Sequence, residues 1–249
     1  MILIVGTNKD DVLYFSSILK DKRTEMVFDR YELEIGTIFN QEILIIKEQY
    51  TSLLAASVIT NILDNHYVDL VINVGRCVSL DGRLKPGDIV ISGRIIDVNV
   101  DMTTYKNVKV AQIPSFNRDF TVQSDIIDYL RAGLTKRTYA NAKVVTFFSS
   151  DNLGEENISR LENGHHLFGI KEELVALDFN SSGVAIASTL KDVPYVSVKV
   201  VGRRLSQLEN VDLYLKVLDS YINLGKGVVS TIGDIASNNV LTEGDSYGF

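Results

Sequence analysis

Short apolar segments alternate with segments of helical periodicity along most of the chain, and this alternation most constrains the fold. The strand-like segments carry valine and isoleucine at consecutive positions, which is typical of strands covered on both faces. The segments between them carry apolar residues at helical spacing. The expected strands are 2–5, 31–36, 42–47, 70–74, 88–98, 144–148, 174–179 and 196–201. The expected helices are 10–21, 52–65, 124–133, 181–190 and 211–224.

This order of elements predicts an α/β fold, a three-layer α/β/α sandwich with a mixed central sheet. The adjacent strands within residues 31–47 add an antiparallel piece to that sheet. No repeat and no linker rich in proline, glycine or serine divides the sequence, so we expect a single domain over residues 1–249. Its last residues, about 238–249, are polar and rich in turn formers, and we expect them to be loosely ordered.

Composition excludes several classes of protein. The net charge of −7 disfavours a nucleic-acid binder, which usually presents a basic surface to phosphates. Cys77 is the only cysteine, so neither an intrachain disulfide nor a cysteine-based zinc site is expected. No apolar run approaches the roughly 20 residues of a membrane span, and the first segment lacks the basic flank of a signal peptide. We therefore expect a cytoplasmic protein with no membrane or nucleic-acid partner.

Four separated parts of the sequence resemble a known family in their order and spacing. They resemble the nucleoside phosphorylase and nucleosidase superfamily, and most closely its methylthioadenosine/S-adenosylhomocysteine nucleosidase branch. The parts are "ILIVGTNKDDV" (2–12), "VDLVINVGRCVSLDGRLKPGDIVIS" (68–92), "VDMTTYKNVKVAQIP" (100–114), and "FFSSDNL" (147–153) taken with "ALDFNSSGVAIAS" (176–188) and "VPYVSVKVVGRR" (193–204).

The resemblance implies a protein that cleaves the N-glycosidic bond of a purine nucleoside or thionucleoside with water, without a metal or an organic cofactor. It also implies a homodimer in which residues 100–114 serve the partner's pocket. Such a reaction needs oxygen ligands for a ribose that becomes cationic, an acid for the leaving base and a carboxylate for the water.

The resemblance assigns water activation to Asp11, whose carboxylate is one methylene shorter than the family's glutamate. The alternative is that Asp10 and Asp11 only stabilise the first turn of a helix. Ribose recognition falls on Asp178, Phe179 and Asn180. Asn180 lacks the negative charge of the family's acid, and it could equally serve as a helix N-cap.

Arg203 stands where the family has the aspartate that protonates the base, and a guanidinium cannot donate a proton at neutral pH. Together with Asn180 it predicts an impaired catalytic site. Arg76, Cys77 and Val78 fill a loop that is built from small residues in the family.

If Arg76 and Arg203 both face the pocket, they form a cationic site that either binds an anion or is neutralised by a nearby aspartate. The candidates for that aspartate are Asp11, Asp151 and Asp178. Alternatively, Arg76 turns outward to solvent or to a subunit interface.

Ser150 and Asp151 preserve an element that contacts the adenine or its loop in the family, and Leu153 replaces an aromatic residue there. The three histidines are expected at the surface or in loops and not as metal ligands. The sequence thus predicts a nucleosidase-like protein with impaired catalysis. Two alternatives stay open, a protein that binds a ligand or partner without turnover, and a nucleosidase for an anionic nucleoside-like ligand.

Overall fold

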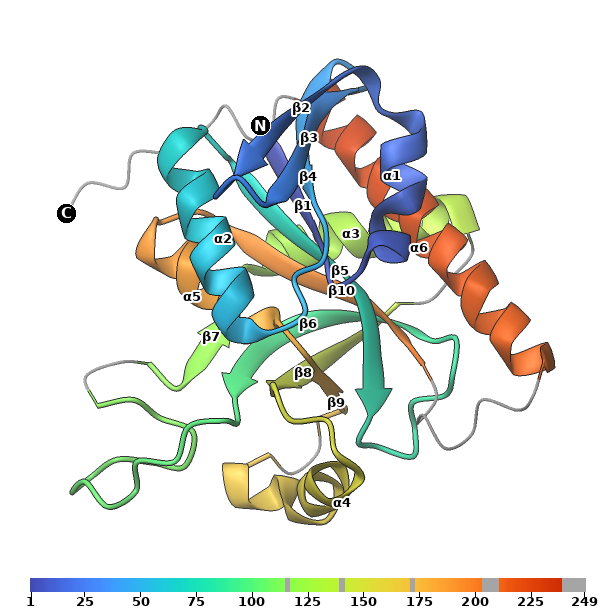
Figure 1. Cartoon of the computed structure of the whole chain (residues 1–249). Helices are drawn as coiled ribbons and strands as arrows, with labels where there is room; N and C mark the ends of the chain where they lie inside the picture. Colours follow the sequence, from blue (N-terminus) through green and yellow to red (C-terminus); the bar gives the residue numbers. More distant parts are fainter. Residues whose placement is uncertain (115–116, 139–141, 171–172, 203–210, 239–249) are drawn as a thin grey trace.

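The structure is a computed structural model that describes residues 1–114, 117–138, 142–170, 173–202 and 211–238. Within these residues a mixed sheet lies between two sets of helices, which confirms the predicted α/β fold (Figure 1). The strands are β1 (Ile2–Gly6), β2 (Lys20–Val27), β3 (Tyr31–Ile38), β4 (Gln41–Ile46), β5 (Leu70–Ser79), β6 (Ile89–Asp97), β7 (Asp119–Thr121), β8 (Lys143–Ser149), β9 (Val175–Asp178) and β10 (Tyr195–Val201). The helices are η1 (Lys9–Val12), α1 (Leu13–Ile18), α2 (Ser52–Asn65), α3 (Ser124–Thr138), α4 (Glu155–Gly164), η2 (His165–Phe168), α5 (Ser181–Leu190) and α6 (Val211–Asn238).

The sheet has an open part and a closed part. β1 pairs in parallel with β5 and β4, and the antiparallel strands β3 and β2 extend the sheet beyond β4. On the other side, β5, β10, β6, β8 and β9 pair in a ring, because β5 pairs with both β10 and β9. The alternation of elements does not predict this ring, which depends on two residue pairs between β5 and β9.

Helices cover both faces of the open part. α2 packs against α5 on one face, and α3 packs against α6, beside α1, on the other (Figure 1). β1 accordingly has no exposed residue, since all of its side chains lie between two helical layers. Burial of each large aliphatic side chain contributes about 1.5–3 kcal/mol, so this strand anchors the core.

A second, smaller apolar core lies under α4. Ile158 and Leu161 of α4 pack there with residues of β6, β8 and β9. The rings of Phe148 and Phe168 lie 4.7 Å apart within it. This core holds the ends of β8 and β9, which carry residues of the candidate site.

The structure corrects several predicted elements. The helix expected over 10–21 ends at Ile18, and Lys20–Val27 form the edge strand β2. β7 and α4 were not predicted, and α6 continues well beyond residue 224 to Asn238. After Asn238 the segment expected to be loosely ordered lies outside the described residues. No helix within those residues has both the length and the apolar character that a membrane crossing requires.

Candidate active site

The parallel strands β1, β5 and β10 end at the same edge of the sheet, where open α/β sheets bind their ligands. Lys199 of β10 lies opposite Gly75 of β5, and η1 brings Asp11 to the same place. A Cβ atom on Gly75 would lie 2.8 Å from Thr7 Oγ1 and 3.0 Å from Asp11 Oδ2. It would lie 3.3 Å from Lys199 Nζ. Only glycine therefore leaves room for these polar groups, and its φ of +152° also favours glycine.

Asp11 is a buried carboxylate with one oxygen unused. The residue is 4% exposed, and Oδ2 accepts a hydrogen bond from the Asn8 amide at 2.9 Å, which completes the capping box of η1. Oδ1 has no hydrogen-bond partner among the described residues. Burial raises the pKa of Asp11, and the Asn8 amide, Lys199 and Arg76 oppose this rise without cancelling it. Asp11 thus caps its helix and also presents a free acceptor, whereas Asp10 is exposed.

Lys199 carries a fully buried positive charge. Its Nζ donates to Asn180 Oδ1 at 3.0 Å and to Asn73 Oδ1 at 3.1 Å, and it lies 3.4 Å from Thr7 Oγ1. The same atom forms an ion pair with Asp178 Oδ2 at 3.5 Å, and both side chains are 0% exposed. A buried ammonium needs such partners, because desolvation without them is very costly.

Asp178 and Asn180 are held by the protein's own polar groups. Asp178 accepts hydrogen bonds from the hydroxyl and, at 3.4 Å, from the amide of Ser181. Asn180 Oδ1 accepts from Asn73 at 3.1 Å as well as from Lys199, and Nδ2 donates to the Gln49 carbonyl at 2.8 Å. Asn180 occupies the N-cap position of α5, but its side chain makes no capping hydrogen bond. One amide hydrogen is all that Asn180 has left for a ligand.

Arg76 faces α6. Its Nε donates to the Tyr221 hydroxyl at 3.0 Å, and the guanidinium carbon lies 5.3 Å from the centre of the Tyr221 ring. The positive charge of Arg76 also acts on Asp11, whose pKa it lowers. Tyr221 also lies close enough to Asp11 to lower the pKa of Asp11. Its hydroxyl nevertheless forms no hydrogen bond with Asp11 Oδ1. Arg76 is therefore partly neutralised by Asp11, while the side chain as a whole remains exposed.

Three predicted ligand residues contribute to packing. Cys77 is buried, its Sγ lies 3.7 Å from the Val200 carbonyl, and burial raises the pKa of its thiol. Val78 and Leu153 are half-buried and pack against the second core. A ligand contact remains a prediction for all three.

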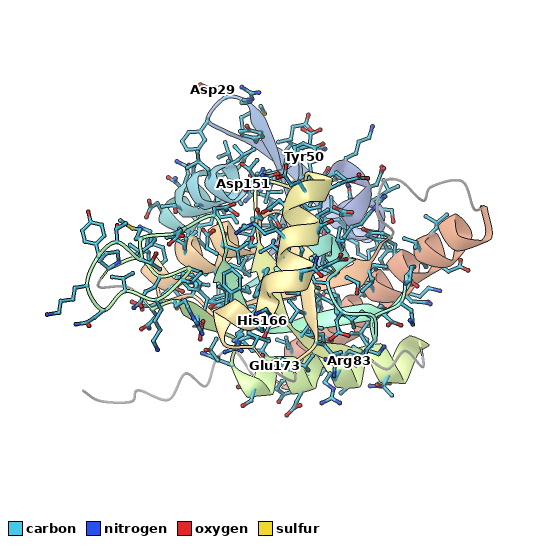
Figure 2. The ribbon with its side chains drawn as sticks, turned by 90° about the horizontal axis from the view of Figure 1, so that it is seen from below. Asp29, Tyr50, Arg83, Asp151, His166 and Glu173 are labelled. Atoms are coloured by element: carbon cyan, nitrogen blue, oxygen red, sulfur yellow. The ribbon has the colours of Figure 1, made fainter. Side chains whose placement is uncertain are left out.

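The other predicted residues hold the start of α2 or a neighbouring loop. Asp151 Oδ1, labelled in Figure 2, accepts a hydrogen bond from the Ser52 amide at 2.6 Å. The Phe179 carbonyl accepts from Ser52 Oγ at 3.2 Å. Ser150 Oγ donates to the Asn99 side chain at 3.0 Å. These contacts position the loops around the site, and Arg203 lies outside the described residues.

Sequence reasoning missed Lys199, Asn73 and Tyr221. Lys199 could have been identified from the sequence, because a lysine inside the strand "YVSVKVV" requires a buried counter-charge if the strand is central. Tyr221 sits on a long helix and gave no such signal. Among the described residues, no three histidine, cysteine or carboxylate side chains gather as a metal site.

Known proteins match this chain over most of its length. The 5'-methylthioadenosine/S-adenosylhomocysteine nucleosidase of Marinomonas sp. (strain MWYL1) is 25% identical over 218 residues, covering 86% of this chain and 91% of that protein. The nucleosidase of the same name from Staphylococcus haemolyticus (strain JCSC1435) is 26% identical over 213 residues, covering 84% and 87%.

Solved structures of such nucleosidases have the same fold. The enzyme from Colwellia psychrerythraea 34H, in complex with adenine, has a TM-score of 0.80 at 20% identity and covers 93% of this chain and 94% of its own. The enzyme from Neisseria meningitidis, in complex with methylthio-immucillin-A, has a TM-score of 0.80 at 18% identity and covers 94% and 98%.

The family model of the phosphorylase superfamily matches residues 1–222. This match spans nearly all of the strands and helices that form the sheet edge around Asp11 and Lys199. It confirms the family resemblance predicted from the sequence, and the chain belongs to the phosphorylase superfamily.

Proposed function

We propose that this protein binds a purine nucleoside or thionucleoside at the edge formed by β1, β5 and β10 and hydrolyses its N-glycosidic bond slowly. The observation that carries the proposal is the buried Oδ1 of Asp11, which has no hydrogen-bond partner among the described residues and is an acceptor suited to a water molecule or a ribose hydroxyl. The nucleosidases to which the chain is similar, one of them crystallised with adenine, support the choice of ligand.

The proposed step begins with a water molecule whose proton passes to Asp11. The water oxygen forms a bond to the ribose carbon as the bond from that carbon to the base nitrogen breaks. The bonding electron pair leaves with the purine, which takes up a proton from solvent water, and Asp11 returns the proton that it received to solvent. A raised pKa makes the Asp11 carboxylate a better base.

Two features support a slow reaction. Arg203 replaces the base-protonating acid implied by the resemblance, and general acid catalysis is typically worth about 10²–10⁴-fold in rate. In addition, Lys199 and Arg76 place two positive charges beside Asp11 and Asp178. Positive charge at the site stabilises a cationic ribose less than a further carboxylate in its place would.

The test is base release from methylthioadenosine, S-adenosylhomocysteine, inosine and uridine at high protein concentration, followed by chromatography. We expect slow release of purine, loss of that release in Asp11→Asn, and full retention in Asp10→Asn. The second variant is a matched control, because it removes the neighbouring but exposed carboxylate. Absence of base release from every substrate would refute the proposed hydrolysis.

Binding without turnover is the second candidate, and the amide of Asn180, which has only one hydrogen left for a ligand, favours it. Its oxygen accepts from Lys199 and Asn73, and its nitrogen donates to Gln49, so little capacity remains for the ribose. Isothermal calorimetry separates the two candidates, since heat of binding without base release would select the second. Recovery of activity in Asn180→Glu with Arg203→Asp would then identify a disabled enzyme.

We also infer that the protein is a homodimer, and a cytoplasmic location remains a prediction. Tyr105 and Ile113, in the segment that the resemblance assigns to the dimer, are 57% and 41% exposed. Light scattering should give twice the chain mass of 27.7 kDa, and Tyr105→Ser with Ile113→Ser should lower it. A monomer at micromolar concentration would contradict the inference.

A further inference from the structure

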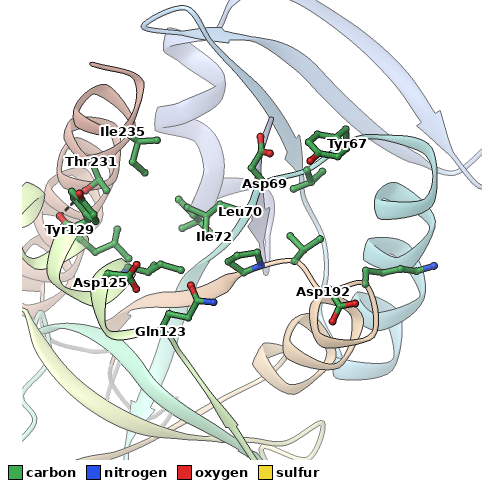
Figure 3. Close-up of a pocket in the computed structure, with 16 residues that line it drawn as sticks. Tyr67, Asp69, Leu70, Ile72, Gln123, Asp125, Tyr129, Asp192, Thr231 and Ile235 are labelled. Carbon is green, nitrogen blue, oxygen red and sulfur yellow. Dashed lines mark hydrogen bonds between the residues drawn. The ribbon is translucent and has the colours of Figure 1, made fainter. Parts of the chain in front are cut away.

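A cavity lies at the opposite edge of the sheet from the candidate active site. It has a volume of about 510 Å³ and opens between the start of β5, the residues before β10, and helices α3 and α6 (Figure 3). Leu70 of its lining is five residues before Gly75, a separation of roughly 16 Å along a strand. The cavity is thus separate from the residues that surround Asp11.

The lining suits the apolar body of a small molecule. Leu70, Leu130 and Ile235 are buried, and Val193 and Pro194 add half-buried apolar surface. The volume falls within the roughly 300–1,000 Å³ of typical small-molecule pockets. Apolar area of this kind favours a ring-sized hydrocarbon group.

The charge around the cavity is negative and not balanced by the described residues. Asp125 and Asp192 form no ion pair among those residues, and Asp125 accepts only the Ile126 amide, at 3.0 Å. The nearby cations are already engaged, since Lys191 pairs with Asp64. The ammonium group of Met1 likewise pairs with Asp69 at 2.5 Å.

Two tyrosines extend the preference for a cation. Tyr67 is 83% exposed and Tyr129 is 36% exposed, and both line the cavity from different elements (Figure 3). Aromatic faces attract organic ammonium groups through their quadrupole. An anion at the same place would meet the carboxylates of Asp125 and Asp192, which pair with no cation in the part of the chain that the structure describes.

We propose that this cavity is a second ligand site, which binds an organic cation with a ring-sized apolar body and one protonated amine. The apolar lining takes the body, and the amine lies against Asp125 of α3 or against Asp192 of the turn after α5, which stand on opposite sides of the cavity (Figure 3). The proposal does not depend on the proposed nucleosidase activity.

The test compares three probes of one shape, phenethylamine, phenethyl alcohol and phenylacetate, by nuclear magnetic resonance titration of the labelled protein. Phenethylamine should bind in the millimolar range and shift the signals of cavity residues such as Tyr129, while phenylacetate should not bind. Equal binding of the three probes, no binding of phenethylamine, or shifts confined to the residues around Asp11 would overturn the proposal.

Variants test the role of charge. Asp125→Asn with Asp192→Asn removes the charge attraction for the amine and should weaken phenethylamine binding roughly tenfold. Asp29→Asn with Asp128→Asn changes the net charge equally at exposed positions outside the lining and should leave binding unchanged. If both double variants weakened phenethylamine binding equally, the effect would come from the net charge of the protein alone, and the proposal would be overturned. A Val193→Trp variant should block the cavity, and unchanged binding to it would also count against the site.

Discussion

Replacing Lys199 with methionine tests whether the buried ion pair organises the site. Lys199→Met removes the charge that lies 3.5 Å from Asp178 Oδ2 and leaves a fully buried carboxylate without a counter-charge. It also removes a donor from Asn180 and from Asn73. Breaking a buried pair from one side typically costs about 3–5 kcal/mol. For a chain of this size that loss corresponds to a fall in Tm of about 6–20 °C.

The assay is thermal and urea unfolding followed by circular dichroism at neutral pH. Lys191→Met serves as the matched control, because Lys191 pairs with Asp64 at the surface, where an ion pair contributes about 0–1 kcal/mol. Lys199→Met with Asp178→Asn should recover most of the lost stability, since neither charge is then left alone. This double variant keeps the experiment decisive if the single variant fails to fold. A loss below about 1 kcal/mol for Lys199→Met would refute the reasoning.

Three further predictions follow from single side chains. Gly75→Ala should destabilise the protein by about 1–3 kcal/mol in urea unfolding, because the new Cβ would lie 2.8 Å from Thr7 Oγ1 and the φ of this position is unfavourable for alanine. Unchanged stability would contradict this geometry. The pKa of Asp11 is higher in the folded than in the unfolded protein. Asp11 therefore contributes to the free energy of unfolding at a pH below the pKa that it has in the unfolded chain, and this contribution is lost as the pH rises through its pKa in the folded protein. Asp11→Asn should therefore raise the free energy of unfolding at neutral pH. In the same variant, kcat/KM should no longer rise with pH through the raised pKa of Asp11. A less stable variant would contradict the direction of the pKa shift. Cys77, which is 1% exposed and has a raised thiol pKa, should react with a disulfide reagent in urea but not in the native protein, and rapid native reaction would contradict its burial.

The sequence predicted the buried strands well because their physics is local. Residues 70–74 and 196–201 consist mostly of valine, leucine and isoleucine, with Asn73 and Lys199 among them, and both became central strands. β2 was missed because an edge strand can be charged along its length, and all of its residues except Val27 are exposed. α4 was missed because it buries only Ile158 and Leu161, too few to reveal a helical period.

The site was predicted only in part, because strand ends are brought together by the topology. Asp11, Asp178 and Asn180 were identified from the resemblance, and the structure gathers all three around Lys199. The direction of Arg76 could not be predicted, since it depends on Tyr221, which is 145 positions away in the chain. No local pattern links a strand residue to a helix so distant in sequence.

The unpartnered oxygen of Asp11 argues against an anionic ligand at the candidate active site. Asp11 Oδ1 is buried and has no hydrogen-bond donor among the described residues. Such an oxygen requires a ligand that brings a hydrogen, as water and ribose hydroxyls do. A phosphate or carboxylate would instead place lone pairs against it, while Lys199 already has its own partners and Arg76 is turned to Tyr221. The hydrogen-bonding demand of Asp11 Oδ1 therefore favours a neutral nucleoside, even though both a lysine and an arginine stand at this edge of the sheet.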